Sequence, residues 1–196
     1  MVKTRQLSGT LACAAILLAG AAACSDSPDD TKPASPTIDA RKVTDPGELV
    51  NLGIQQGQAG KLDEAKETFE RVLTLDGTNK YAWFNLGYIA QSRNQVDDAI
   101  KNYDKALQAD SSYKPALYNK AIVSESKEPA AAVALYQEIL AIDSKSATAH
   151  LRLGLLFAKQ GDETGANREF QAAVTLDSGL VEAVPAEYRA SYASGA

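Results

Sequence analysis

Apolar residues between positions 83 and 110 recur in two runs, each with the spacing of one face of an α-helix. They are Trp83, Leu86, Gly87 and Ala90 in the first run, and Ala99, Ile100, Tyr103, Ala106 and Leu107 in the second. The stretch from Ser92 to Asp98 between them is polar, as expected of a turn. The pattern predicts two antiparallel helices that pack through their apolar faces.

The same pattern occurs once before this segment and twice after it. Small residues align in the first run at Gly53, Gly87, Ala121 and Gly154, and in the second run at Ala65, Ala99, Ala132 and Ala166. The intervals between the aligned first-run residues are 34, 34 and 33 residues. Because one helical hairpin cannot bury its apolar face alone, neighbouring units must stack. The chain is therefore predicted to be all-α.

These residues resemble the tetratricopeptide repeat, a 34-residue helical hairpin. Its second-helix aromatic is present in every unit, as Phe69, Tyr103, Tyr136 and Phe170. Its closing proline is replaced by Gly77, Ser111, Ser144 and Ser178. The resemblance implies a right-handed α-solenoid of about four hairpins with a C-terminal capping helix. The units span about 47–79, 80–113, 114–146 and 147–178, and unit three, one residue shorter, is expected to turn more tightly near Glu128 and Pro129.

Both ends of this 47–178 array carry end signals. Asp45 is a candidate N-cap, and Pro46 suits the first turn of the first helix. In the segment 179–196, Leu180, Val184 and Tyr188 fall at helical spacing and predict a cap over the last unit. Pro185 marks a break or a start in that helix.

Residues 1–23 have the layout of a secretory signal, with a basic start, an apolar middle and small residues at the end. Ala21 to Cys24 resembles a bacterial lipobox, which implies that Cys24 is diacylated. The protein is then exported and lipid-anchored on the outer face of a bacterial membrane or in the envelope. Two alternatives stay open, namely ordinary Ala-x-Ala cleavage with secretion, and an uncleaved span formed by the 18 uncharged residues from Leu7 to Cys24.

The segment 24–46 is rich in Ser, Asp and Pro and predicts a disordered tether about 25 Å in r.m.s. span. No cysteine follows Cys24, so the repeat domain cannot contain a disulfide. Two acyl chains would suffice for durable attachment to a membrane, whereas one holds only marginally.

Charge excludes several classes of partner. Loss of Lys3 and Arg5 with the signal leaves 18 basic against 25 acidic residues, a net charge near −7. A nucleic-acid binder should carry a basic stripe, and none is visible in the sequence. The partner is expected to be a protein or peptide, with no nucleic acid and no small-molecule substrate.

In this family the first helices of successive units line a concave groove. The corresponding positions here are Val50, Phe84, Tyr118 and Leu151, then Ile54, Tyr88, Ile122 and Leu155 one turn later, with Tyr81 at the edge. Such an apolar and aromatic surface suggests a bound peptide or helix. Two alternatives stay open: the tether or the C-terminal tail fills the groove, or the rings are partly buried between units.

A row of carboxamides lies beside these positions, at Asn51, Asn85 and Asn119. A carboxamide both donates and accepts, so the row could pair with the backbone of an extended peptide. Arg152 replaces asparagine in unit four and could meet a carboxylate. The carboxylate clamp with which chaperone-binding members of the family recognise an acidic C-terminal tail is matched only at Asn119 and Arg152. The sequence therefore argues against recognition of such a tail.

The sequence offers no catalytic, cofactor or metal site. His150 is the only histidine and stands at the tryptophan position of unit four, where packing explains it. The pairs Asp63-Glu64 and Asp97-Asp98 stand at predicted second-helix starts and suit caps near the positive end of the helix dipole. We therefore expect a noncatalytic interaction scaffold. The alternative is a structural or self-associating component of an envelope complex.

Overall fold

The computed structural model describes residues 42–189; the predicted signal, Cys24 and nearly all of the predicted tether lie outside them. Eight long helices follow one another along the described chain. They are α1 (Pro46–Gln58), α2 (Leu62–Leu75), α3 (Lys80–Ser92), α4 (Val96–Ala109), α5 (Lys114–Ser124), α6 (Pro129–Ile142), α7 (Ala147–Gln160) and α8 (Glu163–Leu176). A 3₁₀ segment, η1 (Ser178–Ala183), and the single-turn helix α9 (Ala186–Arg189) complete it.

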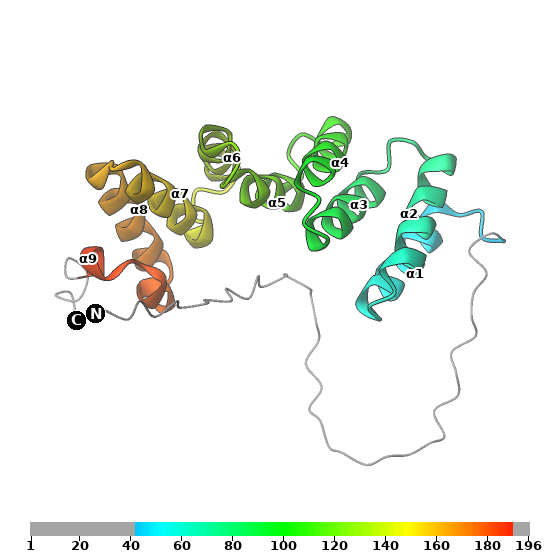
Figure 1. Ribbon diagram of the computed structural model, residues 1–196, viewed down its shortest axis with the longest axis horizontal. Helices are drawn as coiled ribbons and strands as arrows, with labels where there is room; N and C mark the ends of the chain where they lie inside the picture. Colours follow the sequence, from blue (N-terminus) through cyan, green and yellow to red (C-terminus); the bar gives the residue numbers. More distant parts are fainter. Residues whose placement is uncertain (1–41, 190–196) are drawn as a thin grey trace, which may run out of the picture. The chain divides into compact units, whose positions relative to one another are not determined.

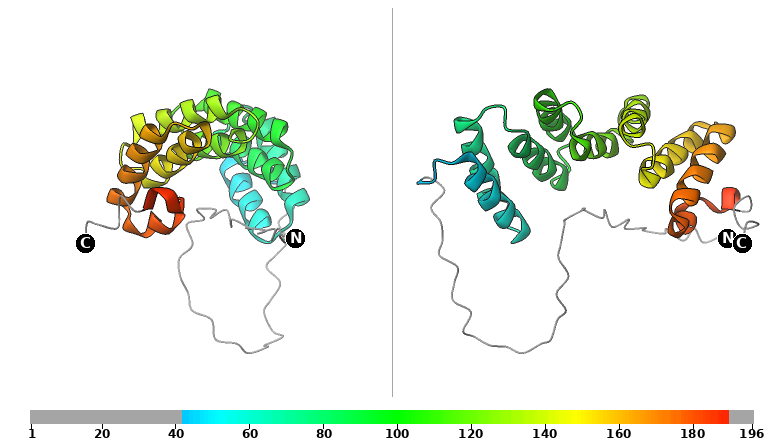
Figure 2. Two further views of the ribbon diagram at one scale, coloured as in Figure 1. Left: turned by 60° about the vertical axis from the view of Figure 1, so that its left-hand side comes forward. Right: turned by 180° about the vertical axis from the view of Figure 1, so that it is seen from behind.

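The helices pair into four hairpins, α1–α2, α3–α4, α5–α6 and α7–α8, and each hairpin packs on the next. Within residues 42–189 they form a curved row, with α3 and α5 toward the inside of the curve and α4 and α6 toward its outside (Figures 1 and 2). The four-hairpin solenoid predicted from the repeat is confirmed.

Close approach of the two helices in a hairpin depends on a glycine in three of the four units. A Cβ added to Gly53, Gly87 or Gly154 would lie 2.6 to 2.7 Å from a ring carbon of the aromatic residue on the second helix. These rings, of Phe69, Tyr103 and Phe170, are buried. Each glycine therefore provides the space that the ring occupies.

The turns between paired helices use a left-handed residue in units one, two and four: Gly60 (φ 75°), Asn94 (φ 58°) and Gly161 (φ 80°). Unit three has no such residue. The expected tight turn there is wrong, because α5 ends early at Ser124 and residues 125–128 connect it to α6. Its missing residue shortens the first helix instead of the connection.

The first helix starts as predicted, with the Asp45 carboxylate accepting a hydrogen bond of 2.7 Å from the Glu48 backbone N–H. The acidic pairs Asp63-Glu64 and Asp97-Asp98 lie in the first turns of α2 and α4, near the positive end of the helix dipole as predicted, but Asp63 and Asp97 are not N-caps. Each lies within the first turn of its helix, after an N-cap residue that makes no side-chain cap bond. Asp63 instead pairs with Arg93 of the next unit at 2.7 Å, and Asp97 pairs with Lys127 in the same way.

The C-terminal cap is interrupted at Pro185, between η1 and α9, as that proline predicts. Its three predicted apolar residues nevertheless pack on the last unit: Val184 is fully buried, and Leu180 and Tyr188 contact the same cluster. The Tyr188 ring lies 5.1 Å from that of Phe170. Arg189 closes the cap by donating to the carbonyl oxygens of Val184 and Glu182 at 2.7 and 2.6 Å.

Aspartates at the ends of second helices bind lysines at the starts of the first helices of the same units. The Lys80 ammonium lies 2.6 Å from Asp110, and the Lys114 ammonium lies 3.1 Å from Asp143. The lysine hydrogen bond is the main cause that lowers the pKa of each carboxyl, assisted by Ser112 at Asp110 and by the Lys145 backbone at Asp143.

Acid should therefore weaken the fold. A carboxyl with a lowered folded-state pKa stabilises above the unfolded value, about 3.9, and loses that contribution as the pH falls through the folded value. We expect the free energy of unfolding to fall between about pH 5 and about pH 3, and to fall less in the Asp110→Asn/Asp143→Asn variant. Urea unfolding across this range measures it. Parallel curves for the two proteins would contradict it.

Candidate functional site

Exposure is uneven among the residues predicted to line the groove. Val50 and Leu151 belong to the core, while Phe84, Tyr118 and Leu155 pack partly against it. Ile54 and Ile122 are also half-buried, whereas Asn51 is exposed. Tyr81 and Tyr88 are 48% and 41% exposed. The large apolar surface of this face is thus concentrated on α3.

One of the exposed tyrosines, Tyr81, begins a series of ring contacts that reaches the core. Tyr81 meets Tyr113 edge-on at 5.8 Å, and Tyr113 meets Phe84 edge-on at 5.5 Å. Phe84 in turn lies 5.8 Å from the buried Tyr103. Such offset contacts fix the orientation of the rings. Tyr81 is therefore held in place on this face although half of it is exposed.

Two buried tyrosine hydroxyls are satisfied by residues on this same face. Tyr103 donates to Gln91 and Tyr136 donates to Glu125, each at 2.6 Å. Burial is the main cause that raises the pKa of both phenols, so they remain neutral donors. In units one and four, where the ring is a phenylalanine, the residues at the positions of Gln91 and Glu125 are Gly57 and Ala158.

A residue from the next unit completes each set. The Asn119 side chain acts on the Tyr103 hydroxyl and lowers its pKa, against the larger effect of burial, and Arg152 Nη1 lies 3.4 Å from both carboxylate oxygens of Glu125. We call these sets the tyrosine nodes: Tyr103, Gln91 and Asn119 in one, and Tyr136, Glu125 and Arg152 in the other. The carboxylate that Arg152 meets belongs to the chain itself.

The three asparagines of the predicted row are not equivalent in the structure. Asn119 interacts with the buried phenol of Tyr103, and Asn85 donates to the Tyr81 carbonyl oxygen at 2.8 Å. Asn51 makes no side-chain hydrogen bond within residues 42–189. A peptide ladder of three equivalent amides stays a prediction. Gln91 and Glu125 were not predicted from the sequence. A signal was present, because a polar residue stands at this position only in the two units whose second-helix aromatic is tyrosine.

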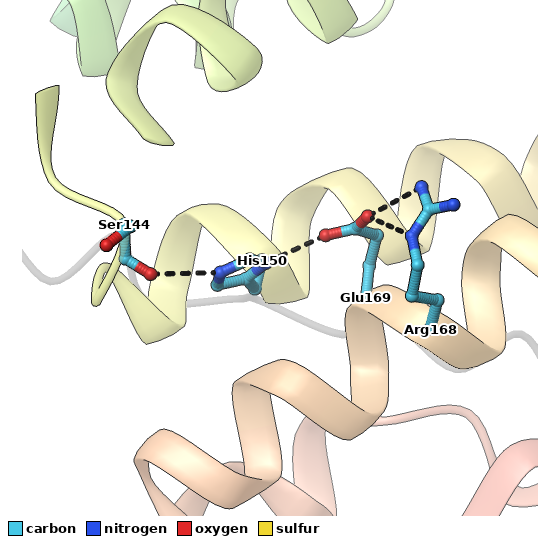
Figure 3. Close-up of polar contacts among 4 residues, drawn as sticks. All are labelled: Ser144, His150, Arg168 and Glu169. Atoms are coloured by element: carbon cyan, nitrogen blue, oxygen red, sulfur yellow. Dashed lines mark hydrogen bonds and ion pairs between the residues drawn. The ribbon is translucent and has the colours of Figure 1, made fainter. Parts of the chain in front are cut away.

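His150 takes over the contact of the tryptophan that it replaces (Figure 3). The Trp83 indole N–H donates to the Gly77 carbonyl oxygen at 2.9 Å, and His150 Nε2 lies 3.3 Å from the equivalent carbonyl of Ser144. The other ring nitrogen, Nδ1, lies 2.7 Å from the buried Glu169. His150 therefore joins the linker between units three and four to α8.

Glu169 is also held from its own helix. Its second carboxylate oxygen accepts two hydrogen bonds from Arg168, at 3.0 and 2.8 Å (Figure 3). This arrangement connects α7, α8 and the linker before α7.

Two hollows lie elsewhere, between successive second helices. One, of about 450 Å³, lies between α2 and α4 and is also lined by Trp83, Leu86 and Ile89 of α3. The other, of about 320 Å³, lies between α4 and α6 and is also lined by Leu117 and Lys120 of α5. Neither is lined by a residue of the predicted groove. Among residues 42–189, no group of three or more His, Cys, Asp or Glu side chains is placed to hold a metal ion.

The repeat is recognised independently of these contacts. A family model described as tetratricopeptide repeat matches residues 50–114 and 124–181. The chain belongs to the tetratricopeptide repeat (TPR) family. No curated protein shows significant similarity to this TPR chain. Within the described range, none of the TPR helices is long and apolar enough to cross a membrane.

Solved structures share the TPR fold. MamA is 22% identical, with a TM-score of 0.66 over 72% of this chain and 84% of that protein. MamA from Desulfovibrio magneticus RS-1 is 21% identical, with a TM-score of 0.63 over 71% and 80%. YrrB, described as a TPR protein with an unusual peptide-binding site, is 20% identical, with a TM-score of 0.65 over 73% and 74%. These likenesses concern the fold.

Proposed function

We propose that this TPR chain is a noncatalytic scaffold that binds a peptide or helix of another protein on the exposed face of α3 and its neighbouring first helices. The observation that supports it is the pair Tyr81 and Tyr88, 48% and 41% exposed on one helix. The other exposed large apolar residues in the described range, Leu75, Ile142 and Leu176, each end a second helix. Only the two tyrosines come from a single helix.

The contacts of this face favour recognition of a preformed shape. Tyr81 is oriented by Tyr113, and Arg152 is neutralised by Glu125. Rigid aromatic side chains lose little conformational entropy on binding, which suits them as anchors. With its charged pair internally compensated, the face should select partners by apolar contact and hydrogen bonding more than by charge.

We further propose that the scaffold is held outside the cytoplasm by acylation of Cys24, which resembles a lipobox cysteine. This cysteine lies outside the described residues, and the support is the sequence pattern alone. The mass of the mature protein tests it. A diacylglyceryl-modified Cys24 at the N-terminus is expected, and a Cys24→Ser variant should leave the membrane fraction. A mature chain beginning at another residue would contradict it.

Substitution of the two tyrosines tests the binding face. We expect Tyr81→Ala/Tyr88→Ala to reduce partner binding at least tenfold, about 1.4 kcal/mol, because paired aromatic anchors carry much of an interface's energy. The measurement is capture from detergent-solubilised membranes, followed by titration with the purified partner. Leu75→Ala/Leu176→Ala is the matched control, since it removes equally exposed apolar residues from second helices.

The outcomes separate the scaffold from its rival. A partner retained by the control and lost by the helical tyrosine variant supports recognition at α3. Loss of self-association instead, with no partner affected, would favour the structural component. Equal capture by all three proteins would contradict a binding role for this face.

A further inference from the structure

We propose that two copies of this chain associate back to back, each through the outward face of helix α6, with the two helices antiparallel. This face lies on the outside of the curved row, away from the binding face proposed on α3 (Figures 1 and 2). Self-association and partner binding therefore use separate surfaces.

Helix α6 carries far less charge than the other second helices. It contains one Asp, Glu, Lys or Arg residue, Glu138, whereas α2 contains six, α4 five and α8 three. At the position of Ala134 the other units all carry a charged residue, namely Glu67, Lys101 and Arg168. A helix that is apolar on nearly all sides is normally buried on all sides. The composition of α6 is therefore that of a helix covered on its outer face as well.

Alanines occupy the centre of that outer face, and larger apolar residues lie at its sides. The central residues are Ala130, Ala134 and Ala141, and the flanking residues are Val133 and Leu140 on one side and Ile142 on the other. The three alanines are exposed, and Ile142 is 45% exposed. Alanines allow the axes of two packed helices to approach to about 8 Å, where the flanking side chains meet. A second helix would thus cover apolar surface that the described chain leaves in water.

Gln137 makes this face self-complementary. It is exposed at the centre of the face, and its side chain forms no hydrogen bond within the described range. A carboxamide both donates and accepts, so two copies of it can bond to each other across a two-fold axis. This favours a second copy of the chain over an unrelated apolar helix.

The charges at the two ends of α6 favour the antiparallel orientation. Glu128 precedes the helix directly, and Lys145 follows its last residue by three positions. Both are exposed, and neither side chain has a hydrogen bond or an ion pair to any residue of 42–189. Positions 128 and 145 are equally distant from a two-fold axis beside Gln137, so each Glu128 faces Lys145 of the second copy. A parallel pair would instead place each charge beside its own copy.

The curvature of the solenoid makes this face accessible and limits its area. Because α6 lies toward the outside of the curve, two copies can meet along it while their other helices curve away. The helix has 14 residues and is about 21 Å long. One pair of such helices lies at the low end of interface sizes, so we expect a dissociation constant of about 10–100 μM. A dimer of this kind presents two α3 faces on opposite sides and would bind a bivalent partner with higher avidity.

Sedimentation equilibrium measures this association. The sample is the mature chain carrying Cys24→Ser, at about 5–300 μM. We expect Ala134→Lys to raise the dissociation constant at least about tenfold, because each copy brings an ammonium group into an apolar contact. Lysine is compatible with the hairpin at this position, since Lys101 occupies it in unit two. Ala109→Lys, the same change at an exposed alanine of α4, is the matched control and should leave the constant within about twofold.

Exchange of the end charges tests the orientation. Glu128→Lys and Lys145→Glu each place like charges together at both ends of the pair, so each alone should raise the dissociation constant about threefold to tenfold at low salt. The double variant Glu128→Lys/Lys145→Glu restores opposite charges and should associate as the parent does. If it associates no better than the single variants, the antiparallel pairing is wrong.

A parent chain that remains monomeric at about 300 μM would overturn the inference, as would an Ala134→Lys chain that associates as strongly as the parent. Circular dichroism verifies that each variant keeps its helices. Tyr81→Ala/Tyr88→Ala should associate as the parent does, because α6 is unchanged. Weaker association of that variant would assign the contact to α3 and contradict the pairing through α6. Its capture of a partner tests the proposed function separately, so either proposal can fail alone.

Discussion

Gly87→Ala should lower the free energy of unfolding by about 2–3 kcal/mol, although alanine is the better helix former. The added Cβ would lie 2.6 Å from two ring carbons of Tyr103. That ring cannot withdraw easily, because it is fully buried and its hydroxyl is bound to Gln91. The two helices of unit two must separate or the ring must leave its rotamer.

Gly57→Ala provides the matched control for this substitution. Gly57 is also a helical glycine, but a Cβ there would meet no atom within 4 Å. The change should stabilise the fold by about 0.5–1 kcal/mol through the reduced entropy of the unfolded chain. Urea unfolding followed at 222 nm measures both. Similar shifts for the two variants would show that helix propensity, and not contact with Tyr103, decides the outcome.

Glu169→Ala should cost about 2–4 kcal/mol of unfolding free energy, because it removes the acceptor shared by His150 and Arg168. The side chain of Glu169 is 8% exposed and that of His150 is 16% exposed, so water cannot fully replace the lost bond. The substitution weakens the contact between α7 and α8. It also weakens the contact of His150 with the Ser144 carbonyl in the linker before α7.

Glu67→Ala is the control for this prediction. Glu67 is exposed on α2, and its loss should change the free energy of unfolding by less than about 0.5 kcal/mol. The same urea titration compares the two variants. If Glu169→Ala falls within the range of the control, the carboxylate contributes nothing beyond its surface neighbours, and the interpretation of Figure 3 as a stabilising contact is wrong.

Periodicity predicted the four hairpins because the signal is redundant: a small residue and an aromatic recur together in each unit. Gly53, Gly87 and Gly154 meet their rings as the pattern implies. The connection in unit three was predicted wrongly, since a missing residue can shorten either a helix or a turn. Only packing decides whether the helix or the turn is shorter, and in unit three the helix α5 is shorter.

The candidate site was less predictable than the fold. The position of a residue in the repeat predicts whether its side chain points toward the groove. It does not predict how much of that side chain is covered by neighbouring residues. Val50 is buried in a cluster that reaches into the next unit, Leu151 is buried in one that includes Val184 of the C-terminal cap, and Arg152 is bound by Glu125. These outcomes depend on contacts between residues about 30 positions apart, which a single sequence does not display.

The tyrosine nodes restrict how this surface can change over evolutionary time. Replacing Tyr136 with phenylalanine would remove the hydroxyl that donates to Glu125, and replacing Glu125 alone would leave the Tyr136 hydroxyl and the Arg152 guanidinium without their shared acceptor. Tyr136 lies on α6 and Arg152 on α7, while Glu125 directly follows the end of α5. A lineage that acquires a different partner must therefore substitute them together, whereas Tyr81 and Tyr88 are free to vary singly.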